Sequence, residues 1–415
     1  MNTPQNQTAF HGLGIVPGIL HVLHALKFTV PTPIQLKAIP VAVEGKDIIG
    51  IAQTGTGKTL AFGIPMVQRL AQRKGKGLIL VPTRELALQV NEMICKLTAA
   101  FKMRTAVLIG GESMHRQIMA VRADPRIIIA TPGRLNDHLQ QRLVRLNDVH
   151  CIVLDEADRM LDMGFLPQIR NVLEMIPKDR QTMLFSASMP SAIVEIAARY
   201  MQLPVRTEVA PQGTAAELVS QELFVVKKEM KGALLGELLK QYSGSVLLFI
   251  RTRVAARKVA KMLVKAGHSA AEIHSDRTLA QRTQALKGFK TGAIRILVAT
   301  DIAARGIDVS AIELVINFDL PDDPENYIHR IGRTGRAGLM GRAITLATPE
   351  QWGDVRDIEK MMRMPIPRGS HPALPNEQFD APAKYAPRPQ ARPQSGSRGP
   401  RRFGHAPGGF RRRAR

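Results

Sequence analysis

The stretch Ala52-Gln53-Thr54-Gly55-Thr56-Gly57-Lys58-Thr59 constrains this chain more than any other part of its sequence. The apolar run Ile48–Ile51 before it predicts a buried strand, and the apolar spacing over Leu60–Leu70 predicts a helix. The glycines therefore fall where a strand turns into a helix N-terminus. Free N–H groups and the helix dipole favour phosphate at such a turn, so the stretch predicts a nucleotide site.

Each residue type in this stretch has a chemical role. Gly55 and Gly57 let backbone N–H groups close around the β-phosphate. Lys58 can reach the β- and γ-phosphate oxygens, and the Thr59 hydroxyl can hold Mg²⁺. A complete P-loop pattern begins with Gly, whereas this one begins with Ala52. The alternative interpretation is a glycine-rich turn that binds no ligand.

Length, charge and hydropathy narrow the class of protein. At 415 residues, 45% of them hydrophobic, the chain can bury two cores of ordinary domain size. Its 58 Lys and Arg residues exceed the 35 Asp and Glu residues, and the net charge of +23 predicts a polyanionic partner, with nucleic acid first. No apolar stretch of about 18 residues offers a membrane span. The N-terminus lacks the regions of a secretory signal, so we expect a cytoplasmic protein.

The two cysteines, Cys95 and Cys151, each lie inside an apolar segment. A disulfide framework needs more cysteines and an oxidising compartment. Two reduced core thiols are therefore expected.

Apolar runs rich in β-branched residues recur along the chain, separated by segments with helical periodicity. This alternation predicts βαβ units and parallel sheets, with ligands at the carboxyl ends of the strands. The first series of expected strands is Ile48–Ile51, Leu78–Val81, Ala106–Ile109, Ile127–Ala130, Cys151–Leu154 and Thr182–Phe185. The second series is Leu223–Val226, Val246–Ile250, Ala271–His274, Ile296–Ala299, Leu314–Asn317 and Ala343–Ala347.

Composition divides the chain into four parts. Residues 1–208 are expected to form one α/β domain, beginning with a mostly helical region over 11–46. The polar stretch 209–218 is expected to be a linker, and 219–364 a second α/β domain that has no Gly-Lys-Thr of its own. One nucleotide site must then serve two domains. Over 365–415, Pro, Gly, Gln, Ser and Arg replace aliphatic residues, which predicts a disordered basic tail.

A second chemical motif is the apolar strand that ends in carboxylates, Cys151-Ile152-Val153-Leu154-Asp155-Glu156-Ala157-Asp158. Asp155 is placed to hold Mg²⁺ through its water shell, and Glu156 to orient and activate the water that attacks the γ-phosphate. The alternative is a helix N-terminus with favourable acidic residues. The phosphate-binding stretch elsewhere in the chain favours the catalytic interpretation.

Four motifs in this order resemble those of the DEAD-box RNA helicases: Pro31-Thr32-Pro33-Ile34-Gln35, Ala52–Thr59, Asp155–Asp158 and His329–Arg336 (HRIGRTGR). The resemblance covers roughly residues 10–350. It implies two tandem RecA-like parallel-sheet domains with ATP bound in the cleft between them. It also implies that Gln35 reads the adenine edge, that Phe28 stacks on the ring and that Phe10 supports both.

The resemblance assigns further roles in the second domain. Arg333 and Arg336 resemble arginine fingers, and Asp308 resembles the ribose contact. An arginine that reaches the developing charge on a γ-phosphate accelerates transfer by about 10³–10⁵. Hydrolysis is therefore expected to depend on domain closure.

In this family RNA lies across both domains and is gripped through phosphates and 2′-hydroxyls. Glycines, small hydroxyls and arginines suit that contact, because they let backbone N–H groups approach phosphates without reading bases. The matching RNA-binding positions are Pro82, Thr83, Arg84, Gly110, Gly111, Thr131, Gly133 and Arg134 in the first domain and Arg251, Thr252 and Thr300 in the second. Ser186-Ala187-Ser188 resembles the motif that couples the ATP site to unwinding, with Ser188 where the family usually has Thr.

Three further positions depart from the family pattern. The family usually has Gly where Lys27 and Ser275 stand, and Gln where Leu279 stands. Leu279 removes a polar group from the RNA-facing part of the second domain, while Arg282 is expected to pack near Phe249. The departures predict a weaker RNA half-site in that domain.

The resemblance implies an ATP-dependent RNA helicase, an RNA-stimulated ATPase that uses ATP and Mg²⁺. Its implied partner is RNA, as a single strand or short duplex and without sequence preference. We expect a monomer, no membrane contact, and ribonucleoprotein or degradation-machinery partners as open options. An ATP-gated RNA clamp or annealing chaperone is the alternative from another class, and a DNA helicase of the same superfamily is a third hypothesis.

The end of the chain is strongly basic. Residues 381–415 hold nine Arg, Lys384 and no Asp or Glu, and so contribute ten of the +23 charges. This composition predicts that the tail tethers RNA.

Overall fold

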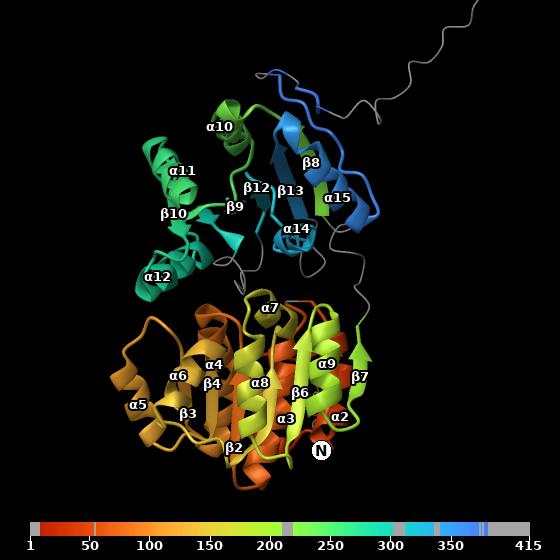
Figure 1. Cartoon of the computed structure of the whole chain (residues 1–415), viewed down its shortest axis with the longest axis vertical. Coiled ribbons are helices and arrows are strands. Elements are labelled where there is room, and N and C mark those ends of the chain that lie inside the picture. Colours follow the sequence, from red (N-terminus) through yellow and green to blue (C-terminus); the bar gives the residue numbers. More distant parts are fainter. Residues whose placement is uncertain are drawn as a thin grey trace, which may run out of the picture.

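The computed structural model describes residues 9–53, 55–209, 219–301, 312–335, 341–372, 375 and 377–380 (Figure 1). Thr54, Asp308 and Arg336 lie outside the described residues. So do 210–218, which make up most of the predicted linker, and the tail over 381–415.

The first half of the chain forms a seven-stranded parallel sheet in the order β3-β4-β2-β5-β6-β1-β7. Its strands are β1 (Ile48–Ile51), β2 (Lys76–Leu80), β3 (Thr105–Leu108), β4 (Ile127–Ala130), β5 (Val149–Leu154), β6 (Gln181–Ser186) and β7 (Val205–Glu208). A parallel sheet is covered on both faces, so its inner strands are near-continuous apolar runs, and β1 and β4 are buried at every residue. Strand β7 was not predicted from the sequence, because this edge strand is short and buries only Thr207.

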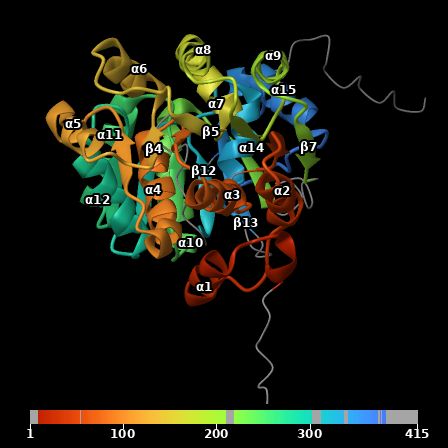
Figure 2. The ribbon, with the colours of Figure 1, turned by 90° about the horizontal axis from the view of Figure 1, so that it is seen from below.

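Helices cover both faces of this sheet, as Figure 2 shows from below. One face carries α1 (Pro17–Ala25), α2 (Pro33–Val43), α3 (Lys58–Gln72) and α4 (Arg84–Thr98). The other carries α6 (Pro132–Gln140), α7 (Ala157–Asp162), α8 (Leu166–Met175) and α9 (Ser191–Tyr200). Helix α5 (Met114–Arg122) packs beside β3, and the short 3₁₀ turns are η1 (His11–Leu13) and η2 (Ala99–Phe101).

The second half repeats this architecture with a six-stranded parallel sheet in the order β10-β11-β9-β12-β13-β8. Its strands are β8 (Val219–Val225), β9 (Val246–Phe249), β10 (Ala270–Ile273), β11 (Ile296–Ala299), β12 (Leu314–Asn317) and β13 (Gly341–Ala347). One face is covered by α10 (Lys231–Gln241) and α11 (Arg253–Lys265). The other is covered by α12 (Leu279–Lys290), α14 (Pro324–Ile331) and α15 (Trp352–Met362), and the short turns are η3 (Lys228–Met230) and η4 (Pro349–Gln351).

The two halves therefore share a RecA-like three-layer design, which confirms the predicted fold class. They sit one above the other in Figure 1, where α7 of the first half lies next to the second half and α14 of the second half next to the first. Residues of both helices line one pocket between the halves. No helix in the described part of the chain is long and apolar enough to cross a membrane.

Packing of the second half continues beyond its last helix. The Leu223 N–H donates to the Pro367 carbonyl at 2.8 Å, and the Gly369 N–H donates to the Leu223 carbonyl at 2.9 Å. Residues 367–369 thus lie along the edge strand β8, and Ile366 is buried. The tail expected over 365–415 therefore begins with residues that pack on the second half, because Ile366 and Phe379 supply apolar contacts that the overall composition conceals.

The cysteine prediction is half wrong. Cys151 is buried in β5, and burial raises the pKa of its thiol to about 12. Cys95 is exposed on α4, where its sulfur lies 3.3 Å from Thr105 Oγ1. Apolar neighbours in sequence did not identify the buried face of that helix.

Candidate functional site

The glycine-rich stretch forms the turn between β1 and α3. Gly55 and Gly57 have φ angles of 84° and 91°, in the left-handed region that favours glycine. A Cβ atom at Gly57 would also overlap Gln35 Nε2. Helix α3 begins at Lys58 directly after the turn, so its unpaired N–H groups and dipole point at the space above Gly57. The turn can therefore cradle an anion.

Lys58 and Asp155 face each other at the carboxyl end of the sheet. Lys58 Nζ lies 3.9 Å from Asp155 Oδ1, and the two side chains are 7% and 4% exposed. Burial raises the pKa of Asp155 to about 6, against the lowering effect of Lys58. Within the described residues the Lys58 ammonium has no hydrogen-bond partner. A buried ammonium without such a partner is costly, so an anion such as a phosphate fits this position.

The oxygen atoms here also fit a divalent cation. Asp155 offers a carboxylate and Thr59, at the start of α3, offers a hydroxyl, and Mg²⁺ prefers such hard oxygen ligands together with water and phosphate oxygens. In the described part of the chain no group of three His, Cys, Asp or Glu side chains could hold a metal alone. A cation at this position would therefore take some of its ligands from the phosphate oxygens of a nucleotide.

Glu156 follows Asp155 with a φ angle of 51°, in the left-handed region, which is strained for a residue with a Cβ atom. Its carboxylate forms a buried ion pair with Arg159 on α7. Burial raises the pKa of Glu156, but Arg159, followed by Lys58 and Arg333, lowers it to about 2. The side chain is therefore an ionised acceptor at neutral pH. Arg159 was not predicted from the sequence, and its position three residues after Glu156 at the start of a helix was the available signal.

Asp158, the last residue of the DEAD motif, connects the candidate nucleotide site to the Ser186-Ala187-Ser188 segment. Its Oδ2 accepts from Ala187 N at 2.9 Å, from Ser188 N at 2.8 Å and from Ser188 Oγ at 3.0 Å. The Asp158 N–H in turn donates to Ser186 Oγ at 3.1 Å. The hydroxyl of Ser188 makes its bond without the methyl group of threonine. No role was predicted for Asp158 from the sequence, although it is part of the motif.

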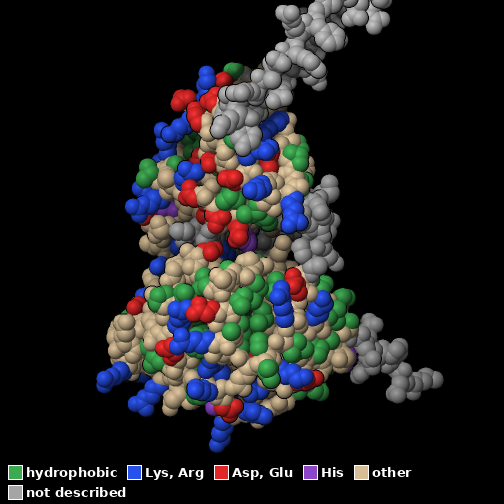
Figure 3. Space-filling view, turned by 45° about the vertical axis from the view of Figure 1, so that its right-hand side comes forward, with side chains coloured by type: hydrophobic (Ala, Val, Ile, Leu, Met, Phe, Trp, Pro, Cys, Tyr) green, Lys and Arg blue, Asp and Glu red, His purple; other side chains and the backbone are tan. Residues whose placement is uncertain are grey.

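A cavity of about 300 Å³ lies between the two halves of the chain. Gln53, Ala187 and Ser188 line it from the first half and Glu325, Ile328, His329, Gly332, Arg333 and Met361 from the second. Arg333 is 4% exposed, and its Nε donates to the His329 carbonyl at 3.2 Å. Burial, then Arg159 and Arg333, lower the pKa of His329, so its ring is neutral. Figure 3 shows acidic side chains of the second half gathered beside the cleft.

Gln35 lies against the glycine-rich turn between β1 and α3, residues 52–57, which is called the phosphate turn below. Its Oε1 accepts from Thr32 N at 2.9 Å, and its Nε2 donates to the Gly57 carbonyl at 3.0 Å. Phe28 is half-buried beside the same core, whereas Phe10 is fully buried, so Phe10 can only support its neighbours. Lys27 adopts a φ of 61°, which explains why glycine suits the position before Phe28.

The predicted RNA-binding residues converge at helix N-termini. Thr83, Thr131 and Thr252 are the N-cap residues of α4, α6 and α11. Thr83 and Thr252 accept hydrogen bonds from backbone N–H groups with their side-chain oxygens, which leaves each hydroxyl hydrogen available to donate. Three helix dipoles therefore favour anions at these threonines.

In the first half, the structure brings Arg84, Gly110, Gly111 and Arg134 together. A Cβ atom at Gly111 would overlap Arg84 Nη1, and one at Gly110 would lie 3.2 Å from Arg84 Nη2. Arg134 Nη1 donates to the Glu112 carbonyl at 3.3 Å. Pro82 is buried at the end of β2 and Gly133 lies in the first turn of α6. The glycines at 110 and 111 allow the Arg84 guanidinium to pack against the backbone.

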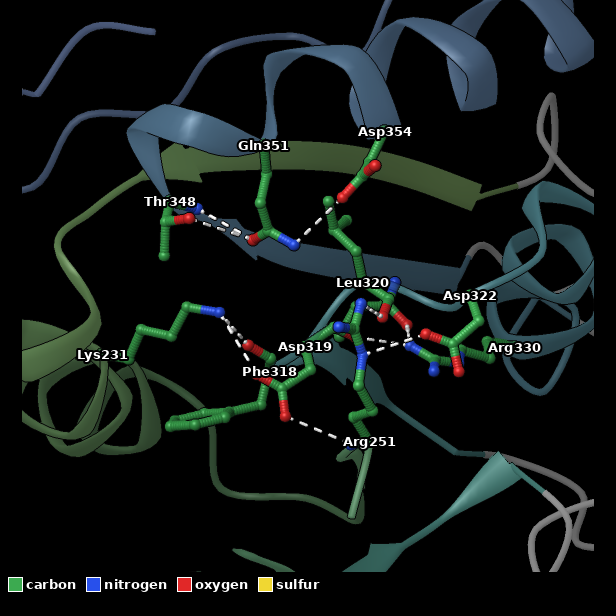
Figure 4. A network of polar contacts seen from close by, with 11 residues as sticks. Lys231, Arg251, Phe318, Asp319, Leu320, Asp322, Arg330, Thr348, Gln351 and Asp354 are labelled. Carbon is green, nitrogen blue, oxygen red and sulfur yellow. Dashed lines mark hydrogen bonds and ion pairs between the residues drawn. The ribbon is translucent and has the colours of Figure 1, made fainter. Parts of the chain in front are cut away.

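In the second half, Arg251 belongs to the polar network in Figure 4. Its Nε lies 3.1 Å from Asp322 Oδ1, and its Nη2 donates to the Leu320 carbonyl at 3.3 Å. Its backbone N–H donates to Asp319 Oδ2 at 3.1 Å, while buried Lys231 donates to the Phe318 carbonyl at 2.6 Å. Thr300 lies at the end of β11, where its N–H donates to the Ile273 carbonyl at 3.3 Å. Arg251 is thus already paired, although it is half exposed.

The expectation that Arg282 packs near Phe249 is wrong. The Phe249 ring instead faces Arg330, whose Cζ lies 5.0 Å from the ring centroid. Arg282 Nη2 forms a buried ion pair with Glu85 Oε2 of the first half, at 2.8 Å. Leu279, on the same helix, packs against the core of the first half. Helix α12 is therefore a contact between the halves, which a sequence without coordinates does not reveal.

Comparisons with known proteins agree with this geometry. The profile of the DEAD/DEAH box helicase family matches residues 32–196, and that of the helicase conserved C-terminal domain matches residues 230–338. The DEAD-box ATP-dependent RNA helicase CshA of Geobacillus kaustophilus is 43% identical over 370 residues, covering 88% of this chain and 79% of that protein. CshA of Bacillus subtilis is 42% identical over 368 residues, covering 88% of this chain and 74% of that protein.

Solved structures extend the likeness to three dimensions. Dbp5 of S. cerevisiae, bound to RNA and ADP BeF3, is similar with a TM-score of 0.78 and 31% identity, covering 88% of this chain and 95% of that one. Mss116p, bound to ssRNA and AMP-PNP, is similar with a TM-score of 0.79 and 28% identity, covering 89% of this chain and 81% of that one.

Proposed function

The chain belongs to the DEAD-box family of ATP-dependent RNA helicases, RNA-stimulated ATPases, and we propose that it couples ATP hydrolysis to closure of its two domains on one RNA strand. Closure on a single strand excludes the second strand. The enzyme would thereby open short duplexes locally or remodel RNA–protein complexes.

One observation carries this proposal: the groups suited to one reaction are divided between the two halves of the chain. Lys58, Asp155 and Glu156 come from the first half, whereas Arg333 comes from the second and lowers the pKa of Glu156. A hydrolysis that needs all four groups can proceed only when the halves are correctly placed. Domain position then controls turnover.

We propose that ATP binds where the phosphate turn, Gln35 and Arg333 meet. The N–H groups of the turn and Lys58 would bind the phosphates, while the ionised Glu156 would orient the attacking water and accept its proton. Arg333 and Arg336 would stabilise the charge that develops on the γ-phosphate. The remaining nucleotide contacts would be Phe28, Gln35, Asp308 and the stretch Ala52, Gln53, Thr54, Gly55, Thr56, Gly57 and Thr59, and Phe10 would support Phe28 and Gln35 from the core.

Asp155 and Thr59 would hold Mg²⁺ beside the phosphates. The ion would neutralise negative charge on the phosphates. When the site is occupied, a change in the position of Asp158 would move Ser186, Ala187 and Ser188 through the hydrogen bonds described above.

We propose that the RNA backbone crosses the helix N-termini capped by Thr83, Thr131 and Thr252. Arg84, Arg134 and the two glycines at 110 and 111 would grip phosphates in the first domain, with Pro82 and Gly133 shaping the surface. Arg251 and Thr300 would extend the grip into the second. Because these contacts need phosphates and 2′-hydroxyls rather than base edges, binding would tolerate sequence and favour RNA over DNA.

The domain organisation that we propose is 1–208, a linker over 209–218, 219–364, and a basic tail, with the packed segment 366–369 kept as part of the second domain. The enzyme would act as a monomer in the cytoplasm, where ATP and RNA are both present. Ribonucleoprotein or degradation-machinery partners are compatible with this role.

Strand displacement tests the proposal. A short RNA duplex with a single-stranded extension should be separated with ATP and Mg²⁺ under multiple turnover. A non-hydrolysable ATP analogue should support at most one round. Equal multiple-turnover displacement with both nucleotides would contradict coupling to hydrolysis. Tight ATP-dependent binding or annealing without displacement would instead identify an RNA clamp or chaperone, and equal ATPase stimulation by single-stranded DNA would identify a DNA helicase.

A further inference from the structure

Gln117 on α5 is a buried amide beneath the candidate RNA surface of the first domain. It is 2% exposed. Its Nε2 donates to the Ile109 carbonyl at 2.8 Å. Its Oε1 accepts from Arg134 Nη1 at 3.4 Å and lies 3.1 Å from His138 Nε2. One side chain thus joins the end of β3, helix α5 and helix α6.

These partners determine which way the amide points. The Ile109 carbonyl can only accept a hydrogen bond, so the NH₂ group faces it and the oxygen faces Arg134 and His138. His138 Nε2 must then carry the hydrogen and donate to that oxygen. Burial, reinforced by Arg134, lowers the pKa of the His138 ring, which is therefore neutral. All hydrogen bonds of Gln117 are consistent with a single arrangement.

The atoms above Gln117 belong to two separate candidate RNA contacts. Ile109 immediately precedes the Gly110–Gly111 turn, against which Arg84 packs. Arg134 follows the start of α6, and its guanidinium also donates to the Glu112 carbonyl at 3.3 Å. Gln117 therefore adds a second, buried link between the turn and the arginine, which come from different strands and helices.

We infer that Gln117 is a positioning residue for RNA, whose amide sets the spacing between the Gly110–Gly111 turn and Arg134 so that both meet one phosphate backbone. The inference rests on the proposed function, since it requires RNA to cross this surface. Gln117 is too buried to touch RNA and acts through the turn and the arginine.

The primary test is Gln117→Leu in the full chain. Leucine fills similar space but leaves the Ile109 carbonyl and the His138 Nε2 hydrogen without a partner, so the turn and Arg134 should lose their fixed spacing. We expect the single-stranded RNA concentration for half-maximal ATPase to rise about tenfold, with kcat at saturating RNA within about twofold. Loss of stability alone would not raise the RNA concentration for half-maximal ATPase while leaving kcat at saturating RNA unchanged.

Gln181→Leu is the matched control. Gln181 is also a buried glutamine whose Nε2 donates to backbone carbonyls, those of Ala42 and Lys46 at 2.7 and 2.9 Å. It begins β6, at the end of the sheet opposite the strand ends that carry the candidate sites. This variant should lower the thermal unfolding midpoint similarly and leave the RNA midpoint unchanged. An equal shift of the RNA midpoint in both variants would overturn the inference.

Gln117→Glu retains side-chain size if the leucine variant does not fold. Its carboxylate would pair with Arg134 and withdraw it from phosphate. The slope of log K against log salt should then flatten by about 0.7, the value for one phosphate contact on a single strand. An unchanged slope with unchanged affinity would contradict the inference.

A double-mutant cycle with Arg134→Ala separates positioning from general damage. If Gln117 acts largely through Arg134, the effect of Gln117→Leu should shrink to less than about threefold in the Arg134→Ala background. Full additivity would contradict this route. Absence of RNA stimulation in the unmodified enzyme would refute the proposed function, whereas normal stimulation with an unchanged RNA midpoint in Gln117→Leu would refute only this inference.

Discussion

At the scale of single residues, the candidate ATP site consists of charges whose properties are set by their neighbours. Asp155 and Glu156 are adjacent, buried carboxylates, yet burial raises the pKa of the first to about 6 and Arg159 helps to lower that of the second to about 2. Adjacent positions in sequence thus acquire different chemistry. Environment separates a carboxylate proposed to bind a cation from one proposed to orient and activate water.

Glu156→Gln tests the second role. The substitution keeps the shape of the side chain but removes the charge that orients and activates water, so we expect ATP turnover to fall by about 10²–10⁴. ATP and RNA should still bind, because Lys58 and the phosphate turn are unchanged, and the protein should become a long-lived clamp. Steady-state ATPase and equilibrium binding are the measurements. Glu44→Gln, at an exposed ion pair, is the control; near-normal turnover in Glu156→Gln would remove this residue from the mechanism.

Arg333→Ala tests the contribution of the second domain to the reaction. Because the contact with the γ-phosphate would be made in the closed, reacting state, RNA-stimulated kcat should fall by about two orders of magnitude or more, with a smaller change in ATP affinity. The same outcome is expected for Arg336. Arg342→Ala, at an exposed pair with Glu222, should leave both quantities unchanged. Weaker ATP binding with normal kcat would make Arg333 a ground-state ligand instead.

At the scale of elements, β1 delivers the phosphate turn, and its neighbours constrain its side chains tightly. A Cβ atom at Gly50 would lie 2.5 Å from Phe185 on the adjacent strand β6. The Phe185 ring is itself held by Phe62 of α3, with ring centroids 5.6 Å apart. The small residue in β1 therefore lets the aromatic pair pack between the sheet and the helix that follows the phosphate turn.

Gly50→Ala should destabilise the first domain by about 1–3 kcal/mol, because the added methyl group overpacks the aromatic pair. Gly236→Ala is the matched control in α10, where a Cβ atom would meet nothing within 4 Å. That change should stabilise its helix by about 0.5–1 kcal/mol. Thermal unfolding of both variants measures the difference. A stability for Gly50→Ala equal to or above that of the unmodified protein would show that the core at β1 can adapt.

At the scale of the whole molecule, the two halves touch through helix α12 as well as across the cleft. The buried Arg282–Glu85 pair joins them beside Arg84, a candidate RNA contact. Leu279, on the same helix, adds an apolar contact to this interface between the two halves. A leucine in place of the usual glutamine thus adds apolar packing between the domains, in addition to removing a polar group near the proposed RNA surface.

Deleting the tail should weaken RNA binding without changing the reaction. The truncated chain to compare with the full chain ends at Asp380, because residues 366–369 pack along β8 and should be retained. Each phosphate neutralised on a single strand contributes about −0.7 to the slope of log K against log salt, so engagement of half of the ten tail charges predicts a slope flatter by about 3.5 units.

In the tail truncation, kcat at saturating RNA should stay constant, since every proposed catalytic residue precedes residue 381. The RNA concentration for half-maximal ATPase should rise at moderate salt. ATPase titrations and RNA binding at several salt concentrations measure both effects. Identical salt slopes for the two chains would assign the tail to a protein partner or to solubility.

Much of this molecule could be predicted from the sequence alone. Each of the twelve expected strands corresponds to a strand in the structure, because parallel strands buried on both faces are continuous apolar runs that turn residues interrupt. The phosphate turn is equally local: it needs glycines at positions of positive φ and a lysine at the first position of the helix. Residues that lie close together in the sequence are enough to predict such features.

The tertiary structure decided what depends on contacts between distant segments. Strand β7 has no apolar run and exists only because β1 offers it a free edge. The exposure of Cys95, the Arg282–Glu85 pair and the network around Gln117 each depend on which face of a helix meets another element. Sequence spacing specifies a helix, but the side on which its polar residues find partners is set by the packing of segments that lie tens of residues apart.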